Sequence, residues 1–429
     1  MIKHSSIIMA LLGASLVAAL GDEPRPLSLK EAEEIALVKH PKITAAELIA
    51  LASKQAVRET RSAFFPTITA NATAVGTTAE NTRIAAGGLN NPLILNRNAE
   101  GINVSQLIFD FGRTANLTAS SKLQSRAQEQ NALATRAQVL LAVNSAYYTA
   151  LQAQSVLAVA RQTVATRQLL FDRVDELAKN KLKSGLDVSF AKVSLGESKL
   201  LLANAENDLQ SEFAMLSNLL GEREERSYRL LDESASANPP AEASQLVQTA
   251  LRDRPDLTQL RFDRDAADRF ARAEKDLHYP TISAVASVGV VPIHDPQLRD
   301  NYAAAGVNLS VPLFEGMLFS AREKEAQLRA QAASENLRDV ENNVIRDVRI
   351  AVLNLSYAAE QMTLTADLLA SANESFDLAQ ARYKVGSSSI VELSQAQLSQ
   401  TQAEIAQARA KYEYQIRQAV LKYQTGQTF

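Results

Sequence analysis

An internal repeat with a constant offset is the feature that most constrains how this chain can fold. The spaced residues Gly101, Asn103, Ser105 and Phe109 recur 205 positions later as Gly306, Asn308, Ser310 and Phe314. The same offset relates the pairs Leu123 and Leu328, Val139 and Val344, Ala191 and Ala396, Ala203 and Ala408, and Gly221 and Gly426. A register held over more than a hundred residues indicates a duplicated structural unit. We therefore expect two copies of one plan.

The boundaries of the copies follow from a second offset. Upstream, Pro41 and Pro66 match Pro255 and Pro280 at an offset of 214, so the first copy carries nine extra residues before Gly101. The stretch DESASANPPAEAS, residues 232–244, has the composition of a linker. We expect a first repeat over residues 22–231 and a second over residues 245–429.

Long helices dominate each expected copy. A capping Ser28 with an acidic residue three places on begins the first helix, and ASQLVQTALRDR begins its counterpart. Residues 113–181 contain neither Gly nor Pro, and apolar residues recur there at intervals of three and four. At 1.5 Å per residue this run would span about 100 Å. Turns near Ser184 and Gly386 predict two helical hairpins, residues 113–221 and 318–426.

Short alternating runs interrupt the helices and predict strands at about 66–76, 101–110, 280–291 and 305–314. In PTITANATAV the apolar residues Ile68, Ala70, Ala72 and Ala74 share one face, and polar residues share the other. The runs are uncharged over about ten residues, the length at which a tilted strand crosses a bilayer.

Two interpretations of these strands stay open from the pattern alone. They could form a small soluble sheet packed on the helices, or part of a membrane barrel. A barrel in lipid must close, and the usual minimum is eight strands, so four strands from one chain would need further copies of the chain.

The amino terminus and the composition narrow the function. Lys3, an apolar stretch and small residues before Asp22 predict a signal peptide over residues 1–21, so the chain is expected to leave the cytoplasm. The net charge of −3 argues against a nucleic-acid partner. The chain has no cysteine, and its four histidines lack metal-ligand spacing. We expect no metal, no cofactor and no catalytic site.

The chain resembles the outer membrane efflux protein family, the TolC-like channels. The resemblance rests on the repeat, on the junctions IFDFGR and LFEG, and on the segment around RYKVGSSSIVELSQA, from Arg382 to Ala396. It implies a mainly helical fold with a membrane portion: a homotrimer whose twelve-stranded β-barrel in the outer membrane lipid continues as a periplasmic barrel of helices. It also implies work with a periplasmic adaptor (membrane fusion) protein and an inner-membrane transporter, in efflux or type I secretion.

The repeat register pairs two acidic residues near the hairpin turns. Asp187 and Glu392 each lie four residues before the paired alanines, so a trimer would bring six carboxylates to one level. They could form a pore constriction that attracts cations, or serve as ordinary first-turn acids that stabilise helix N-termini. The resemblance favours the constriction. It also implies roles for Tyr383, which is retained, for Gln395, where close relatives have an acid, and for Ser388, where they have an arginine.

The same resemblance implies that the hairpin turns dock the adaptor. These residues are Ser184, Gly185, Leu186, Gly386, Ser387, Ser388, Ser389 and Ile390. Small residues there permit close approach, although they are also common turn formers. The function expected from the sequence is therefore a passive export channel. The alternative is a soluble periplasmic coiled-coil scaffold or adaptor, which osmotic shock would release, whereas a channel would need detergent.

Overall fold

The computed structural model of the protein describes residues 25–76, 82–83, 93–94, 97–223, 228–232, 242–293 and 299–427. The expected signal peptide and most of the expected linker lie outside these residues. The chain divides into two compact units, which we treat separately. The tip unit comprises Met1–Val38, Val143–Ser236 and Leu364–Glu413, and the sheet unit comprises Lys39–Ala142, Ala237–Thr363 and Tyr414–Phe429.

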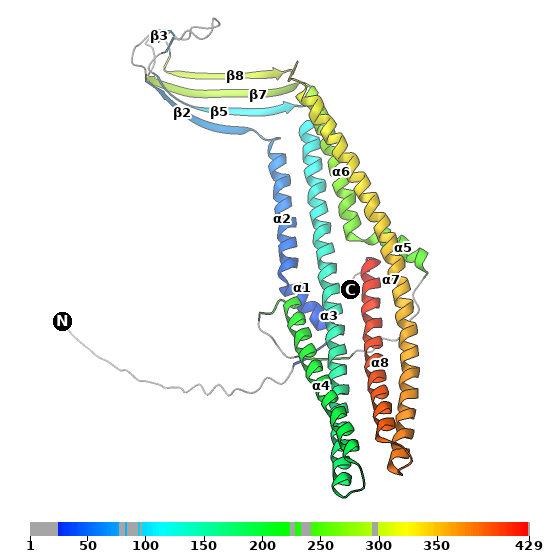
Figure 1. The fold of residues 1–429 in the computed structure, drawn as a ribbon. Helices are drawn as coiled ribbons and strands as arrows, with labels where there is room; N and C mark the ends of the chain where they lie inside the picture. Colours follow the sequence, from blue (N-terminus) through cyan, green and yellow to red (C-terminus); the bar gives the residue numbers. More distant parts are fainter. Residues whose placement is uncertain are drawn as a thin grey trace, which may run out of the picture. The chain divides into compact units, whose positions relative to one another are not determined.

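Four long helices form the two hairpins (Figure 1). Helix α3 (Arg113–Lys179) is followed by α4 (Gly185–Leu219), and α7 (Leu318–Lys384) is followed by α8 (Ile390–Gln424). The members of each pair have the same lengths, 67 and 35 residues, as a duplicated plan requires. Gly221 and Gly426, which the repeat relates, both follow their helices with φ of +72°, the left-handed conformation that suits glycine at a helix C-terminus.

Each copy opens with two helices rather than one. Helix α1 (Leu29–Lys39) precedes α2 (Pro41–Ser62), and α5 (Ala243–Asp253) precedes α6 (Pro255–Lys275). Pro41 and Pro255 each stand in the first turn of the second helix, where proline is tolerated and the preceding residue leaves the helical conformation. The expected cap at Ser28 is confirmed: Glu31 N–H donates to Ser28 Oγ, and Ser28 N–H donates to Glu31 Oε2. A 3₁₀ turn, Asp276–His278, follows α6.

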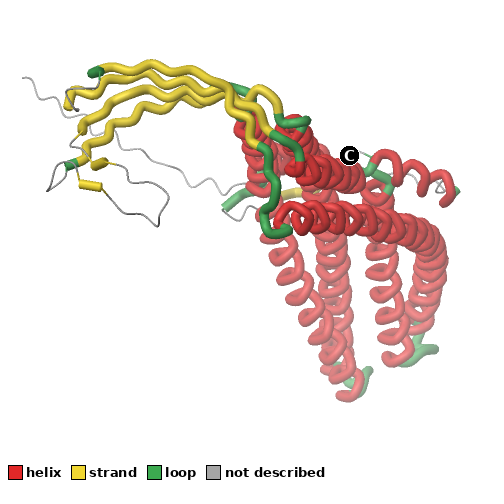
Figure 2. Tube along the Cα trace, turned by 90° about the horizontal axis from the view of Figure 1, so that it is seen from above, coloured by secondary structure: helices red, strands yellow, loops and turns green. Residues whose placement is uncertain are grey.

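The four expected strands form one antiparallel sheet in the order β2-β5-β7-β8. They are β2 (Thr67–Val75), β5 (Arg97–Phe109), β7 (Thr281–Ile293) and β8 (Asn301–Ser310). Figure 2 shows them in yellow, curving together. Strands β5 and β8 each begin four residues before the expected start. β8 also ends at Ser310 instead of about 314, because Pro312 cannot donate a hydrogen bond to a neighbouring strand.

Two small strand pairs complete the described secondary structure. β3 (Thr82–Arg83) pairs with β4 (Leu93–Ile94), and β1 (Arg25–Leu27) pairs in parallel with β6 (Tyr228–Leu230) in the tip unit. The buried Tyr147 of α3 secures the second pair: its Oη lies 2.8 Å from the carbonyl oxygens of Leu27 and Leu231 and accepts the Leu231 N–H at 3.2 Å. This hydroxyl therefore ties both ends of the first repeat to α3.

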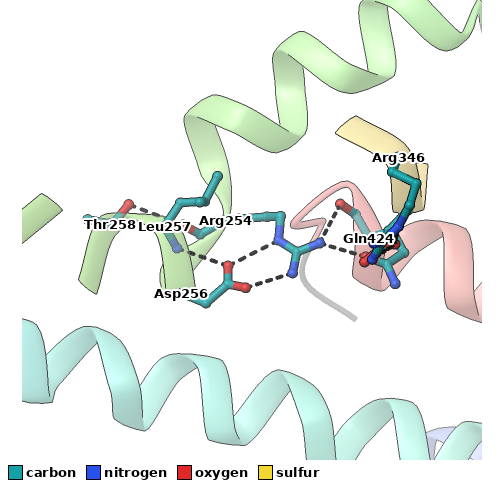
Figure 3. A network of polar contacts seen from close by, with 7 residues as sticks. Arg254, Asp256, Leu257, Thr258, Arg346 and Gln424 are labelled. Atoms are coloured by element: carbon teal, nitrogen blue, oxygen red, sulfur yellow. Dashed lines mark hydrogen bonds and ion pairs between the residues drawn. The ribbon is translucent and has the colours of Figure 1, made fainter. Parts of the chain in front are cut away.

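Within the sheet unit, a buried arginine joins the start of α6 to the end of α8 (Figure 3). Arg254 Nε and Nη2 donate to the two carboxylate oxygens of Asp256 at 3.0 and 2.6 Å, and Nη1 donates to Gln424 Oε1 at 2.6 Å. Gly426 completes the joint, because a Cβ there would lie 3.0 Å from Arg254 N. The bidentate pair with Asp256 fixes the orientation of the Arg254 guanidinium. The arginine thereby links the first and the last long segments of the second copy, α6 and α8.

None of the described helices combines the length and the hydrophobicity needed to cross a membrane.

Candidate functional site

The register of the sheet places its apolar residues in rows on one face. Ile102 of β5 pairs with Ala70 of β2 and Val288 of β7, and Val288 pairs in turn with Ala303 of β8. Large apolar side chains of this face are exposed: Ile68, Ile102, Val288, Val290, Val307 and Leu309. Gln106, which interrupts the apolar pattern, donates its amide to the carbonyls of Phe64 and Leu107. Beyond these residues the same face carries Glu100 of β5 and Asn301 of β8, next to Val290. A soluble protein rarely leaves an apolar surface of this extent in water.

The opposite face of the sheet is mainly polar, although Leu107 and Val285 also lie on it. Thr69 of β2 lies across from Asn103 of β5, and Ser287 of β7 donates a hydrogen bond to the Asn103 side chain. Further along this face, Tyr302 of β8 extends over Gly289 of the adjacent strand β7 and Gly101 of the next strand, β5. A Cβ built on Gly101 would lie 2.2 Å from Tyr302 Oη, and one built on Gly289 would lie 2.5 Å from the same atom. The glycines therefore leave room for the phenol ring to lie flat against the sheet.

The outer strands of the sheet are β2 and β8. Strand β2 pairs only with β5, and β8 pairs only with β7, among the residues that the structure covers. An open edge exposes a row of unpaired backbone N–H and C=O groups, which cannot be left without partners in lipid. The sheet therefore has two open edges, each of which could pair with a further strand.

In the tip unit, Asp187 occupies the third position of α4. Its carboxylate Oδ2 accepts hydrogen bonds from Ser184 N–H at 2.9 Å and from Ser184 Oγ at 2.8 Å, and its own N–H donates to Ser184 Oγ at 3.2 Å. This reciprocal arrangement is a capping box. The hydrogen bonds from Ser184 hold the pKa of Asp187 below its usual value. The helix-cap interpretation is thus realised at Asp187, which remains partly exposed.

Glu392 occupies the matching third position of α8 but makes a different contact. Its N–H donates to Ser389 Oγ at 3.2 Å, as expected for a capping serine. Its carboxylate turns to the preceding helix, where Oε1 lies 2.9 Å from Arg382 Nη1. The two side chains are 43% and 58% exposed, respectively. The repeat therefore places both acids alike along the backbone, while their carboxylates have different partners.

Tyr383 lies between the hairpins. It belongs to a buried cluster in which α3 and α4 contribute two residues and the second hairpin contributes the rest: Val174, Ala191, Phe376, Ala379, Tyr383, Ile390, Leu393 and Ala396. The Lys183 ammonium lies 4.4 Å from the Tyr383 ring centroid, in cation–π geometry. Burial, and secondly the negative charge of Asp187, raise the pKa of the Tyr383 phenol. Its hydroxyl has no hydrogen-bond partner among the residues placed in the structure.

The remaining predicted site residues divide by exposure. Gln395 is exposed and Ser388 is partly exposed. At the turns, exposed positions are Ser184, Gly185, Leu186, Gly386, Ser387 and Ser389. Gly386 has a φ of +80°, a conformation that most other residues avoid. Ile390 is buried in the cluster around Tyr383, so its side chain does not reach the surface of the turn.

Sequence reasoning missed Lys183 and Arg382. Lys183 contacts Tyr383, and Arg382 contacts Glu392. In each pair the two residues belong to different chain segments, so helical or strand spacing in the sequence does not predict the contact. The only available signal was the position of Arg382 in the last turn of α7, where a basic residue commonly stabilises the helix end. No three acidic or histidine side chains within the described ranges converge on a potential metal site.

The chain is similar in sequence to known proteins along most of its length. The family model described as outer membrane efflux protein matches residues 34–222 and 246–427, one range within each copy. The outer membrane protein TolC of Escherichia coli (strain K12) is 24% identical over 357 residues, which is 80% of this chain and 71% of that protein. The outer membrane protein OprJ of Pseudomonas aeruginosa is 28% identical over 312 residues, 69% of this chain and 63% of that protein.

Solved structures share the fold at lower sequence identity. The CmeC outer membrane channel of Campylobacter jejuni superposes with a TM-score of 0.82 at 16% identity, covering 94% of this chain and 86% of that chain. The open state of the MtrE outer membrane channel of Neisseria gonorrhoeae gives a TM-score of 0.75 at 18% identity, covering 93% of this chain and 88% of that chain.

Proposed function

Because the chain belongs to the outer membrane efflux protein family and is an outer membrane efflux channel, we propose that it forms the passive conduit of a tripartite efflux or type I secretion system. In this proposal a periplasmic adaptor and an inner-membrane pump deliver the cargo. The observation that carries the proposal is the open-edged sheet, with one exposed apolar face and one polar face. A closed barrel of such sheets would present the apolar faces to lipid and the polar faces to a water-filled channel.

Channels of this family form trimers, and the open edges of the sheet support the same assembly here. Three copies would contribute twelve strands, with β8 of one copy pairing with β2 of the next. Every backbone group of the barrel would then have a partner.

Exposed apolar residues on the helices of the tip unit support the same assembly. On α4 they are spaced by three and seven residues: Phe190, Val193 and Leu200. On α7 they include Leu364, Leu368 and Leu378. This is the heptad spacing by which helices pack side by side. We propose that neighbouring copies cover these two stripes.

The acids at the hairpin turns are the proposed constriction. Asp187 and Glu392 both stand at the third position of their helices, so threefold assembly would place six carboxylates near one level. The negative charge of Asp187 contributes to the raised pKa of Tyr383, so the two side chains interact electrostatically. Gln395 is exposed one turn after Glu392 on α8. We propose that these residues line the gate and that the exposed turn residues dock the adaptor. Ile390 supports the turn from its buried position.

Replacing both acids, Asp187→Asn with Glu392→Gln, is expected to reduce cation selectivity and block by multivalent cations. Fixed charges act more strongly in a narrow, low-dielectric constriction than on an exposed surface. The measurement is planar-bilayer recording of the purified parent and variant, with the melting temperature as a control. If the variant conducts like the parent but melts markedly lower, the acids are helix caps and not a gate. If the parent gives no discrete conductance, the channel function itself is contradicted.

A further inference from the structure

We propose that Arg382 is a selectivity-determining residue, which sets the charge that the second hairpin presents at the constriction by neutralising Glu392 of the same chain. The inference rests on the proposed gate. It concerns the sign and size of the charge there, which the two acids alone do not determine.

The turn itself holds Arg382 in place. Ser387 N–H donates to the Arg382 carbonyl at 2.9 Å, and Ser387 Oγ donates to the same oxygen at 3.2 Å. The Arg382 guanidinium reaches back over the turn, with Nη2 at 3.4 Å from the Ser387 carbonyl and Nη1 at 2.9 Å from Glu392. The hydrogen bonds from Ser387 to the Arg382 carbonyl fix the backbone from which the Arg382 side chain extends. The guanidinium is therefore directed across the turn toward the first turn of α8.

The first hairpin has no equivalent of this ion pair. The position that the repeat relates to Arg382 is Leu177, which carries no charge. Asp187 instead satisfies its carboxylate with Ser184, and Lys183 lies over the Tyr383 ring. Asp187 therefore has no cation in direct ion-pair contact, although the Lys183 ammonium acts on it at longer range, whereas Glu392 is paired directly with Arg382. The two hairpins are alike in backbone and unlike in charge.

In a trimer this difference changes the sum of charges at the constriction. Six acids would be offset by three copies of Arg382, so the formal charge of these groups would be about half of what the acids alone supply. The other nearby cation of the same helix, Lys384, donates to Gln380 Oε1 at 3.1 Å and does not contact Glu392. An exposed ion pair of this kind adds little to stability, so removing Arg382 should alter conduction more than folding.

The test is the reversal potential under a salt gradient in planar bilayers. Arg382→Gln should raise the cation-to-anion permeability ratio by about two- to fivefold, as expected for uncovering three charges at a distance of about 10 Å. Glu392→Gln should lower the ratio, because it leaves Arg382 unpaired. The double variant should lie near the parent. Arg382→Lys keeps the charge and should behave as the parent, while Lys384→Gln should change the ratio less than Arg382→Gln.

The outcomes separate this inference from the gate on which it rests. If Glu392→Gln shifts the reversal potential and Arg382→Gln does not, the gate stands and the role of Arg382 is refuted. If Arg382→Lys shifts it as much as Arg382→Gln, shape rather than charge matters, and the inference fails. If none of the variants shifts it, the proposed gate fails as well. Trimer mass and melting temperature, measured for each variant, establish that the comparison is between folded channels.

Discussion

Replacing Val307 by arginine is expected to abolish insertion into the outer membrane, whereas the same change at the adjacent Asn308 is expected to be tolerated. Val307 is 69% exposed on the apolar face of β8, and Asn308 is on the polar face. An arginine on the lipid face of a barrel costs about 2–4 kcal/mol near the bilayer midplane, and a trimer would carry three of them. The measurement is the amount of trimer in the outer membrane fraction after sucrose-gradient separation.

The paired design makes this a test of the face assignment and not of strand stability in general. Val307→Arg and Asn308→Arg introduce the same side chain at successive positions of one strand. Val307→Leu, which keeps the face apolar, is the conservative control and should insert as the parent does. Equal loss of insertion for the two arginine variants, or a greater loss for Asn308→Arg, would contradict a lipid-facing Val307 and with it the barrel.

Charged replacements at the two hairpin turns are expected to abolish export while leaving the trimer and its membrane insertion intact. Leu186 and Ser387 are exposed, one at each turn, and a carboxylate forced into a docking contact would lack a partner. The double variant Leu186→Glu with Ser387→Glu should lower export by about tenfold or more, since each 1.4 kcal/mol of lost docking energy is a factor of ten. Export is measured as resistance or secretion in cells that depend on this channel.

Two controls accompany this test of docking. Trimer mass and membrane insertion of the same variant should match the parent, which separates loss of docking from loss of assembly. Gly386→Ala reports the effect of strain alone, because the positive φ at this position disfavours any side chain. Unchanged export by the double variant would remove the docking assignment from the turns.

Much of the fold could be predicted from the sequence because local rules and the repeat agree. The absence of Gly and Pro between residues 113 and 181 predicted a long helix, and in the structure this helix spans Arg113–Lys179. Alternation in PTITANATAV predicted a strand and also its faces, since side chains of a strand alternate whatever its neighbours are. The prediction of two repeats, each with a strand pair and a long helical hairpin, is confirmed.

The contacts that define the candidate site could not be predicted in the same way. The offset of 205 related Asp187 to Glu392, and the structure places both at the third position of a helix. The offset could not predict that the Asp187 carboxylate accepts hydrogen bonds from Ser184 while the Glu392 carboxylate pairs with Arg382. These partners depend on which side chains meet across each turn. Arg254 was likewise missed, because its partner Gln424 lies 170 residues away in the sequence.

The early end of β8 and the division of the opening helices were further differences, and both follow from proline. Pro312 ends β8 before the apolar residues that follow it, and Pro41 divides the opening helix of the first copy. In each case the hydrophobic pattern continues across a residue whose backbone cannot take part in the hydrogen bonding of the element before it.

The detergent-corrected mass of the purified protein tests the central claim most directly, because four strands with two open edges cannot form a membrane barrel in one chain. We predict a particle of three chains that stays intact in mild detergent and separates only on strong denaturation. Three chains supply twelve strands and pair every edge. A monomeric particle that nevertheless inserts and conducts would contradict the account. So would a stable dimer, whose eight strands would close a barrel of a different size.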